Sequence, residues 1–418
     1  MNPLPDNEQD SKVQVGKHTI LALVLFSFLN LINQIDRRAL VTIFPLLKLE
    51  WGLSDAQLGL AVSLFTIGRT LSSLPAGWLA DRKGIFLVLR PMVLLWSLLT
   101  IASGWAGRFF TFIALRMGVG LMDGANGPLD LAYLGRVSPK NRRGTFLAIY
   151  SIALYLGSGL GVIYAGAVGE RFGWRWVFII PGILGLLATI GLFLLPRDPQ
   201  MKTEVETSSE EKFHSSGFYW LIQQPLPGIF VGGALGVFAS TALVSWLPTY
   251  LTRQYSLSLM QAGLITGGII IPASMVGTLM GGFLSDRFGK RYPKLRFQIS
   301  AAGLGLAMVF GLAGLWSTSM AGTISFFLLT AISFTLPVSP LLVLVQESVH
   351  KQELATAQAA FGITTQLLGA APATGLVGLL SDQLGLQMAL VLPFVAVGLG
   401  AIVIALTGNV KQGTERKL

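Results

Sequence analysis

Residues 77–84 read Gly-Trp-Leu-Ala-Asp-Arg-Lys-Gly, and residues 282–289 read Gly-Phe-Leu-Ser-Asp-Arg-Phe-Gly. A second pair of matching stretches lies just before them, because Leu-Ser-x-x-Gln-x-Gly-Leu occupies both 53–60 and 257–264. The two copies lie 205 residues apart in the first pair and 204 residues apart in the second, so the offset between copies is almost constant. These anchors predict two parallel repeats, an arrangement found in membrane transporters.

The composition is that of a membrane protein. Hydrophobic residues make up 52% of the 418 residues and charged residues 12%, whereas a soluble chain has about 25% charged residues. A disordered chain would be far less hydrophobic, and a membrane barrel would alternate apolar with polar residues. We therefore expect an all-α polytopic membrane protein.

Twelve stretches are long and apolar enough to span a bilayer, which needs about 20 residues. They run near 18–44, 55–79, 85–106, 108–134, 144–168, 174–195, 225–251, 258–284, 295–315, 319–346, 352–380 and 386–407. The sequence between them predicts a tail at 1–17, a six-helix bundle at 18–196, an acidic linker at 197–219, a second six-helix bundle at 220–407 and a tail at 408–418.

The positive charges predict the orientation. The side that holds both termini and the linker carries 21 Lys and Arg residues, and the opposite side carries 5. Lysine and arginine accumulate in cytoplasmic loops, so both termini are expected in the cytoplasm of a cell-membrane protein. The net charge of +10 then reflects topology, and a nucleic-acid partner is not expected.

Several kinds of chemistry lack the residues they need. The chain has no cysteine, its three histidines lack metal-ligand spacing, and Gly289-Lys290 is followed by arginine instead of the Ser or Thr of a phosphate-binding loop. We expect no metal, no cofactor and no enzymatic activity. The polar start of the chain and the length of the first apolar stretch do not resemble a cleaved signal, so we expect the first helix to be retained.

At this point the chain resembles the major facilitator superfamily over essentially its whole length, through the doubled Gly-x-Leu-[Ala/Ser]-Asp-Arg-x-Gly loop. The glycine that opens each loop, Gly77 or Gly282, would allow a neighbouring helix to approach closely. The resemblance implies a gate between helices at Gly77, Asp81 and Arg82, and a weaker one at Asp286 and Arg287.

Charged residues inside membrane spans mark functional sites, because burying them in a bilayer is costly. The first span holds Asn33, Asp36, Arg37 and Arg38, the second Arg69, and the fourth Arg116, Asp123, Asn126 and Asp130. The fourth-span charges recur every seven residues, so they share one face of a helix.

Within the superfamily the chain most resembles the spinster group of proposed lipid transporters. The resemblance rests on Asn-x-x-Asp-Arg at 33–37, on Arg116 with an acid seven residues later, on Gly-Ser-Gly-Leu-Gly at 157–161 and on Trp-Arg-Trp at 174–176. Spinsters carry glutamate where this chain has Asp123, and uncharged residues where it has Arg38 and Arg69. These departures leave the substrate open.

The buried acids predict proton coupling. Desolvation disfavours a charged carboxylate and a nearby arginine favours it, so a small movement of the arginine can load or release a proton. We assign this role to Asp36 and Asp123, with Arg37 and Arg116 as their partners. The alternative for each acid is a permanently paired network that only joins two helices, and for Arg38 and Asp130 the sequence does not decide between function and structure.

The excess of arginine over acid in the spans favours an anionic substrate, because arginine grips carboxylate or phosphate through two hydrogen bonds. Candidate substrate-binding residues in the first half are Asn33, Arg37, Arg69, Arg116 and Asn126. The second half offers only uncharged candidates, and among them we select Gln366. A lysophospholipid-like amphiphile and a small organic or sugar acid both fit. We expect a proton-coupled, alternating-access transporter that functions as a monomer in the lipid bilayer. A ligand sensor with the same fold, a membrane enzyme and a passive channel are the alternatives.

Overall fold

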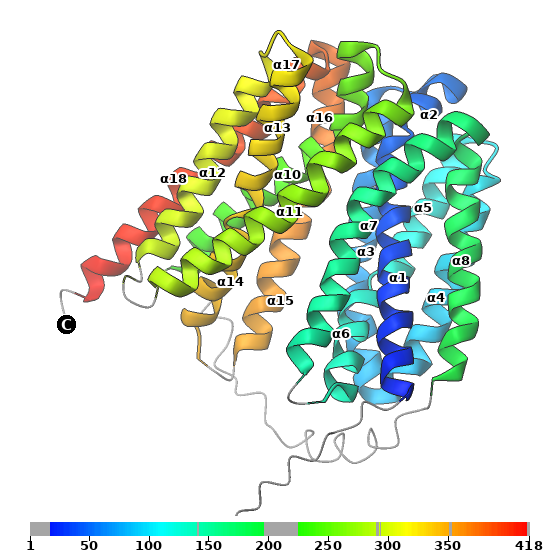
Figure 1. The fold of residues 1–418 in the computed structure, drawn as a ribbon, viewed down its shortest axis with the longest axis horizontal. Coiled ribbons are helices and arrows are strands. Elements are labelled where there is room, and N and C mark those ends of the chain that lie inside the picture. The colour runs from blue at the N-terminus through cyan, green and yellow to red at the C-terminus, as the bar shows by residue number, and fades with distance from the viewer. Residues whose placement is uncertain are drawn as a thin grey trace, which may run out of the picture.

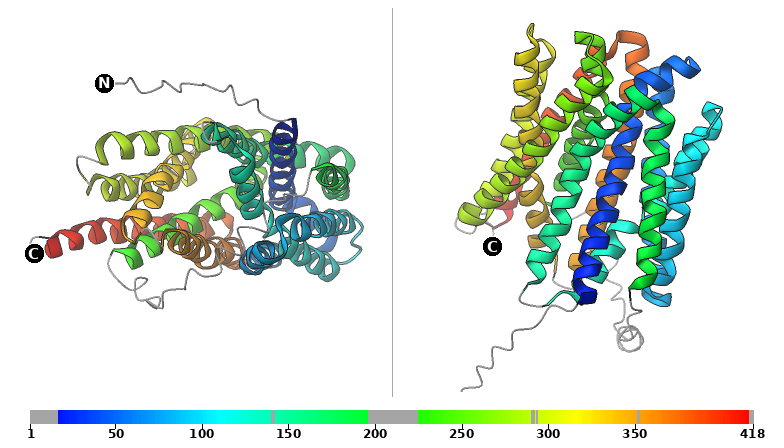
Figure 2. Two further views of the ribbon diagram at one scale, coloured as in Figure 1. Left: turned by 90° about the horizontal axis from the view of Figure 1, so that it is seen from below. Right: turned by 45° about the vertical axis from the view of Figure 1, so that its right-hand side comes forward.

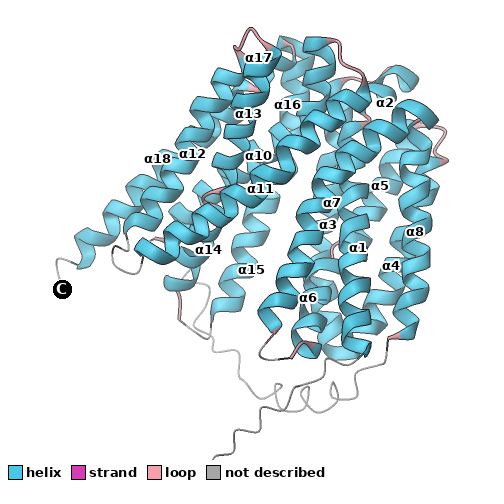
Figure 3. Cartoon of the chain, viewed as in Figure 1, coloured by secondary structure: helices cyan, strands magenta, loops and turns pink. Residues whose placement is uncertain are grey.

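The computed structural model describes residues 17–139, 142–195, 225–289, 292, 294–350 and 353–415. Within these ranges the chain is helical, and Figure 3 shows helices joined by short loops and no strand in this part. The predicted all-α fold is confirmed. The linker predicted at 197–219 lies outside the described residues, as does nearly all of the predicted tail at 1–17.

The first half contains eight helices in the described residues. They are α1 (Lys17–Thr42), α2 (Phe44–Trp51), α3 (Asp55–Lys83), α4 (Ile85–Gly104), α5 (Phe109–Asp123), α6 (Asn126–Val137), α7 (Arg143–Phe172) and α8 (Trp174–Leu194). The short α2 begins with a proline in its first turn and ends at Gly52, whose φ of 63° is left-handed. That backbone conformation suits glycine, which has no Cβ.

The second half repeats this pattern. Its described helices are α10 (Leu226–Tyr255), α11 (Leu259–Gly289), α12 (Lys294–Leu315), α13 (Met320–Thr335), α14 (Val338–Glu347), α15 (Leu354–Thr364), the π-helical turn η3 (Thr365–Ala370), α16 (Ala371–Leu384), α17 (Leu386–Ala389) and α18 (Val391–Glu415). Helix α18 continues beyond residue 407, where the sequence analysis places the start of the second tail.

Eleven helical stretches in the described residues are long and apolar enough to cross a membrane. Two of them combine consecutive elements, namely Met320–Glu347 (α13 and α14) and Thr356–Leu384 (α15, η3 and α16). The remaining expected span, near 108–134, is present as the separate helices α5 and α6. Pro128 lacks the N–H that would bond the carbonyl of Gly124, which accounts for the break. Pro340 stands 340 − 128 = 212 residues later, just after the equivalent break between α13 and α14. The repeat thus extends to the interrupted helices.

The repeated Leu-Ser-x-x-Gln-x-Gly-Leu stretches form equivalent helix starts. At α3, the Ser54 hydroxyl accepts a hydrogen bond from the Gln57 N–H, and the Gln57 side chain accepts one from the Ser54 N–H. Ser258 and Gln261 form the same reciprocal pair at α11. Such a capping box satisfies backbone donors that a helix start would otherwise leave unpaired. The sequence repeat therefore encodes a structural repeat.

Glycines bring the two halves together at two helix pairs. A Cβ on Gly59 of α3 would collide with the backbone of Thr374 and Gly375 of α16. In the equivalent pair, a Cβ on Gly263 of α11 would lie 2.8 Å from the Val162 carbonyl oxygen of α7. Only glycine permits such close backbone approach. The halves therefore meet along α3 with α16 and α7 with α11.

Figures 1 and 2 show how these pairs arrange the molecule. Helices α7 and α11 cross between the halves in Figure 1, and the ribbons of α6 and α7 diverge from those of α14 and α15 toward the lower end. The start of α1 and the end of α8 lie at this lower end, and α2 and α17 lie at the opposite end. We call the end with α2 and α17 the outer end.

Candidate functional site

The close packing of α3 against α5 determines where the polar residues of these two helices lie. A Cβ on Gly120 of α5 would collide with the Phe65 carbonyl of α3, and a Cβ on Gly124 would collide with the Arg69 carbonyl. The pattern of small residues four apart is one that lets helices pack closely in membranes. It brings Arg69 of α3 beside Asp123, the last residue of α5.

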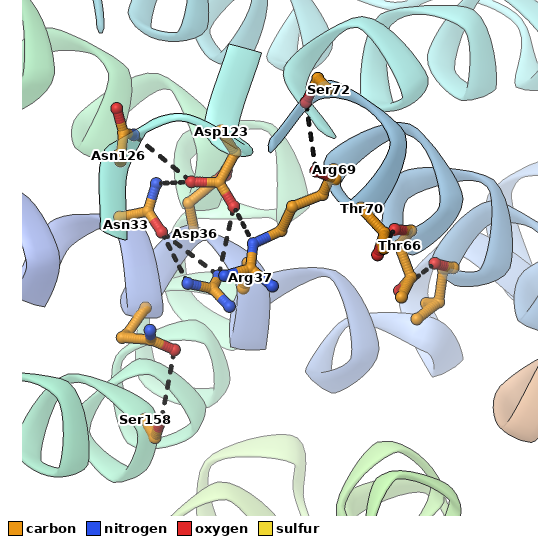
Figure 4. Close-up of polar contacts among 12 residues, drawn as sticks. Asn33, Asp36, Arg37, Thr66, Arg69, Thr70, Ser72, Asp123, Asn126 and Ser158 are labelled. Carbon is orange, nitrogen blue, oxygen red and sulfur yellow. Dashed lines mark hydrogen bonds and ion pairs between the residues drawn. The ribbon is translucent and has the colours of Figure 1, made fainter. Parts of the chain in front are cut away.

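Asp123 is the centre of a buried cluster, which we call the Asp123 cluster (Asn33, Arg37, Arg69, Asp123 and Asn126; Figure 4). Its Oδ2 lies 3.0 Å from Nε of Arg69 and 3.5 Å from Nε of Arg37. Its Oδ1 accepts hydrogen bonds from the amides of Asn33 and, at 3.4 Å, Asn126. Asn33 in turn accepts from Nε and Nη2 of Arg37 at 3.2 and 3.0 Å. Two arginines therefore share one carboxylate.

The exposure of these side chains differs sharply. The Asp123 side chain is 1% exposed, whereas those of Arg37 and Arg69 are 23% and 25% exposed. The acid is thus enclosed while both cations keep an accessible surface. The structure brings together five residues that the sequence analysis singles out, from α1, α3, α5 and α6.

Asp36 and Arg116 form a second, fully enclosed pair. Nη1 of Arg116 donates to Oδ1 of Asp36 at 2.9 Å, and both side chains are 0% exposed. Arg116 also donates to Ser103 and Thr100 of α4 at 3.2 and 3.4 Å, and its guanidinium lies 4.5 Å from the ring centre of Phe178 in α8. In this conformation Arg116 reaches no surface that a substrate could touch, so a substrate contact would require the bundle to rearrange.

Asp130 and Gln366 form no hydrogen bond or ion pair with the Asp123 cluster in the part of the chain that the structure describes. Asp130 of α6 is 1% exposed and accepts a hydrogen bond at 3.1 Å from the Tyr150 hydroxyl of α7. Gln366 lies in η3, the turn between α15 and α16, which packs against α10 and α3. Such π-helical turns inside helices occur often at functional sites. The substrate role of Gln366 stays a prediction.

The gate residues taken from the repeated loop stand apart from the opposite half. Asp81, Arg82, Asp286 and Arg287 are exposed, and the Arg82 guanidinium lies 4.1 Å from the ring centre of Trp78 in its own helix. A Cβ on Gly77 would meet no atom within 4 Å, so the close approach expected there is not made in this conformation. The reason is that the halves diverge at this end.

An ion cluster at the outer end was missed by the sequence analysis. Asp55, the first residue of α3, accepts hydrogen bonds from Lys48 at 2.7 Å, from both Nη atoms of Arg253 at 2.6 and 2.7 Å, and from Ser381 at 2.6 Å. Arg253 belongs to α10 and Ser381 to α16, so the carboxylate joins the two halves. We call these four residues the outer ion cluster.

Two further acids bind helix starts across the same interface. Asp382 of α16 accepts from the N–H groups of Asp55 and Ala56 at 2.8 and 2.9 Å. In the equivalent place Glu170 of α7 accepts from the Met260 N–H of α11 at 2.7 Å. A helix start favours negative charge, so each contact stabilises the closed outer end. The repeated Leu-Ser-x-x-Gln-x-Gly-Leu stretches marked these two places as equivalent in the sequence, but nothing there placed the opposing acids beside them.

Comparison with known proteins gives a consistent result. A model of the Major Facilitator Superfamily matches residues 26–374. A "Probable L-galactonate transporter" of Escherichia coli K12 is 27% identical over 297 residues, covering 68% of this chain and 65% of that protein. "Protein spinster homolog 1" of Xenopus tropicalis is 24% identical over 394 residues, covering 88% and 74%.

The fold matches a solved structure closely. A bacterial homologue of the human lysosomal transporter Spinster, described as inward-facing and unoccupied, superposes with a TM-score of 0.83 at 21% identity, and the match covers 94% of this chain and 97% of that one.

Proposed function

The chain belongs to the Major Facilitator Superfamily, whose members are membrane transporters and not enzymes, and we propose that it moves a small organic anion together with protons by alternating access. The observation that carries this proposal is the sharing of one buried carboxylate, Asp123, by two partly exposed arginines.

Asp123 couples the anion to the proton. While Asp123 is ionised, its Oδ2 forms ion pairs with Nε of Arg37 and Nε of Arg69 and so neutralises part of their charge. When Asp123 is protonated, both guanidiniums lose that partner and favour another carboxylate, which they can hold through paired hydrogen bonds. Substrate binding and protonation of Asp123 therefore support each other.

Asp36 and Arg116 form the second step of the relay. Protonating Asp36 would leave the Arg116 guanidinium as an uncompensated buried charge, which costs several kcal/mol unless the surrounding groups move. We propose that this cost drives a rearrangement of α1 against α4 and α5. The exposed gate residues and the closed outer end support the assignment of the structure as the state open at the opposite end. The distribution of Lys and Arg supports placing that end, and both termini, in the cytoplasm.

A small acid is favoured over an amphiphile by one comparison, since the protein named as a galactonate transporter matches this chain at 27% identity. The spinster relatives support a lipid-like substrate as the second candidate. Both share an acidic group that the Asp123 cluster would bind.

Purified protein in liposomes tests the proposal. An inwardly directed proton gradient should drive accumulation of labelled galactonate, and Asp36→Asn should abolish this coupling while counterflow exchange continues. Arg136→Gln, an exposed change of charge at the end of α6, serves as the matched control. Accumulation of lysophosphatidylglycerol instead would select the second candidate. If no pH gradient drives accumulation of either anion, the coupled-transport proposal is wrong.

A further inference from the structure

Arg38 differs from the other arginines of the first-half spans. Arg37 and Arg69 pair with Asp123, and Arg116 pairs with Asp36. The Nε atoms of both Arg38 and Arg69 are buried without a hydrogen-bond partner. Arg69 has its ion pair with Asp123, whereas Arg38 forms no ion pair with any described residue. The Arg38 residue as a whole is only partly buried. A cation that has no ion pair inside a membrane span is a candidate for ligand binding.

On α1, Arg38 directly follows Arg37 of the Asp123 cluster and projects from the next position around the helix. Successive residues of a helix project about 100° apart. Asn33 and Arg37 point toward Asp123 in Figure 4. Arg38 lies one turn after Gln34, which contacts Ser158 of α7, and a Cβ on Gly161 of α7 would lie 3.0 Å from the Arg38 Cβ. The absence of a side chain at Gly161 thus lets α7 pack closely against α1 at Arg38.

The charges in this region do not balance. Arg37, Arg38 and Arg69 carry three positive charges, and Asp123 and Asp130 carry at most two negative charges, so at least one positive charge is left over. Asp130 contacts Tyr150 and no cation that the structure describes. Protonation of Asp123, which accompanies substrate binding in the proposed function, raises the excess to at least two. One monovalent anion leaves part of that charge uncompensated.

We propose that Arg38 is a second anion subsite and that the transported substrate is an organic acid with two acidic groups on a short carbon chain. One acidic group binds Arg37 and Arg69 in place of Asp123, and the other binds Arg38. This inference rests on the proposed function, because it requires the Asp123 cluster to hold the first acidic group.

A matched pair of acids tests it. Galactarate and galactonate have the same six-carbon chain and differ by one terminal carboxylate, so binding of each to the purified protein is measured by titration calorimetry. The wild-type protein should bind galactarate more tightly. Arg38→Gln should weaken galactarate binding by about tenfold or more, the size of one charge-assisted hydrogen bond, and change galactonate binding by less than about twofold. Arg38→Lys should retain part of the preference, and Arg136→Gln should retain all of it.

The outcomes are separable. If Arg38→Gln weakens both acids equally, or neither, Arg38 is not a second subsite. If the wild-type protein binds both acids with equal affinity, this inference fails while the proposed function stands. If the wild-type protein binds neither acid, this inference fails, and the proposed function fails with it only if lysophosphatidylglycerol also does not accumulate in the liposome assay. Thermal unfolding of each variant shows whether a loss of binding reflects a loss of folding.

Discussion

Replacing Asp55 by asparagine should open the outer end of the protein. The Asp55 side chain is 2% exposed and contacts Arg253 and Ser381 of the opposite half at 2.6 to 2.7 Å. Asparagine keeps the size of the side chain and its ability to accept one hydrogen bond, but it removes the charge. The variant therefore tests the ionic contact between the halves with little change in packing.

The magnitude follows from these contacts. A hydrogen bond to a charged group contributes about 1.5 to 3 kcal/mol, and water screens part of this for Arg253, whose side chain is 37% exposed. Counting about 1 kcal/mol for Arg253 and about 1 kcal/mol for Ser381 gives about 2 kcal/mol. Because 1.4 kcal/mol corresponds to a factor of ten, the ratio of outer-open to outer-closed molecules should rise about 30-fold.

The absence of cysteine from the sequence makes the assay direct. Cysteines introduced at Leu49 of α2 and Met388 of α17, which are 83% and 53% exposed, carry spin labels on the two halves. Double electron–electron resonance measures the distribution of distances between the two labels. In Asp55→Asn this distribution should gain a population at longer distance.

Glu50→Gln is the matched control, because Glu50 contacts Arg175 and Trp174 within its own half. An unchanged distance distribution in Asp55→Asn, or an equal change in Glu50→Gln, would refute the role of the outer ion cluster.

Three further predictions concern single residues. Gly124→Val should push α5 from the Arg69 carbonyl, cost about 1 to 3 kcal/mol of stability through overpacking and weaken anion binding; an unchanged melting temperature and affinity would contradict the close-packing argument. Arg116→Lys keeps the charge but loses the forked donors, so pH-driven transport should fall at least about tenfold, and full transport would contradict the proposed relay. Hydrogen bonds from Arg175 lower the pKa of Glu50, so this contact should persist above about pH 4.3 and weaken as the pH falls below that value; tryptophan fluorescence of wild type against Glu50→Gln should show an acid transition in the wild type alone.

The sequence predicts the helices and their repeat well, because apolar length and helix starts are local properties. The twelve expected stretches correspond to helices in the described residues, and the capping boxes at Ser54 and Ser258 mark two starts to the residue. The division between α5 and α6 was not predicted. Pro128, which accounts for it, is a local signal that an apolar window of about 20 residues does not register.

The site was predicted in its membership but not in its pairing. Asn33, Arg37, Arg69, Asp123 and Asn126 were all expected in the site, yet the sequence could not show that Arg69 and Arg37 share Asp123 while Arg116 holds Asp36. The partner of each arginine depends on how closely α3 and α5 pack against each other. That distance is determined by glycine contacts between segments far apart in the sequence. The outer ion cluster was missed for the same reason, because Asp55 and Arg253 lie 198 residues apart.

Proton uptake on substrate binding tests the central claim most directly. In weakly buffered detergent solution, a pH-sensitive dye reports protons taken up when a saturating dose of the transported anion is added. The wild-type protein should take up protons as the anion replaces Asp123 at Arg37 and Arg69. Asp123→Asn should bind the anion with equal or higher affinity and take up fewer protons, since the amide cannot titrate. Equal proton uptake by the two proteins would contradict the claim that Asp123 exchanges its arginines for the substrate.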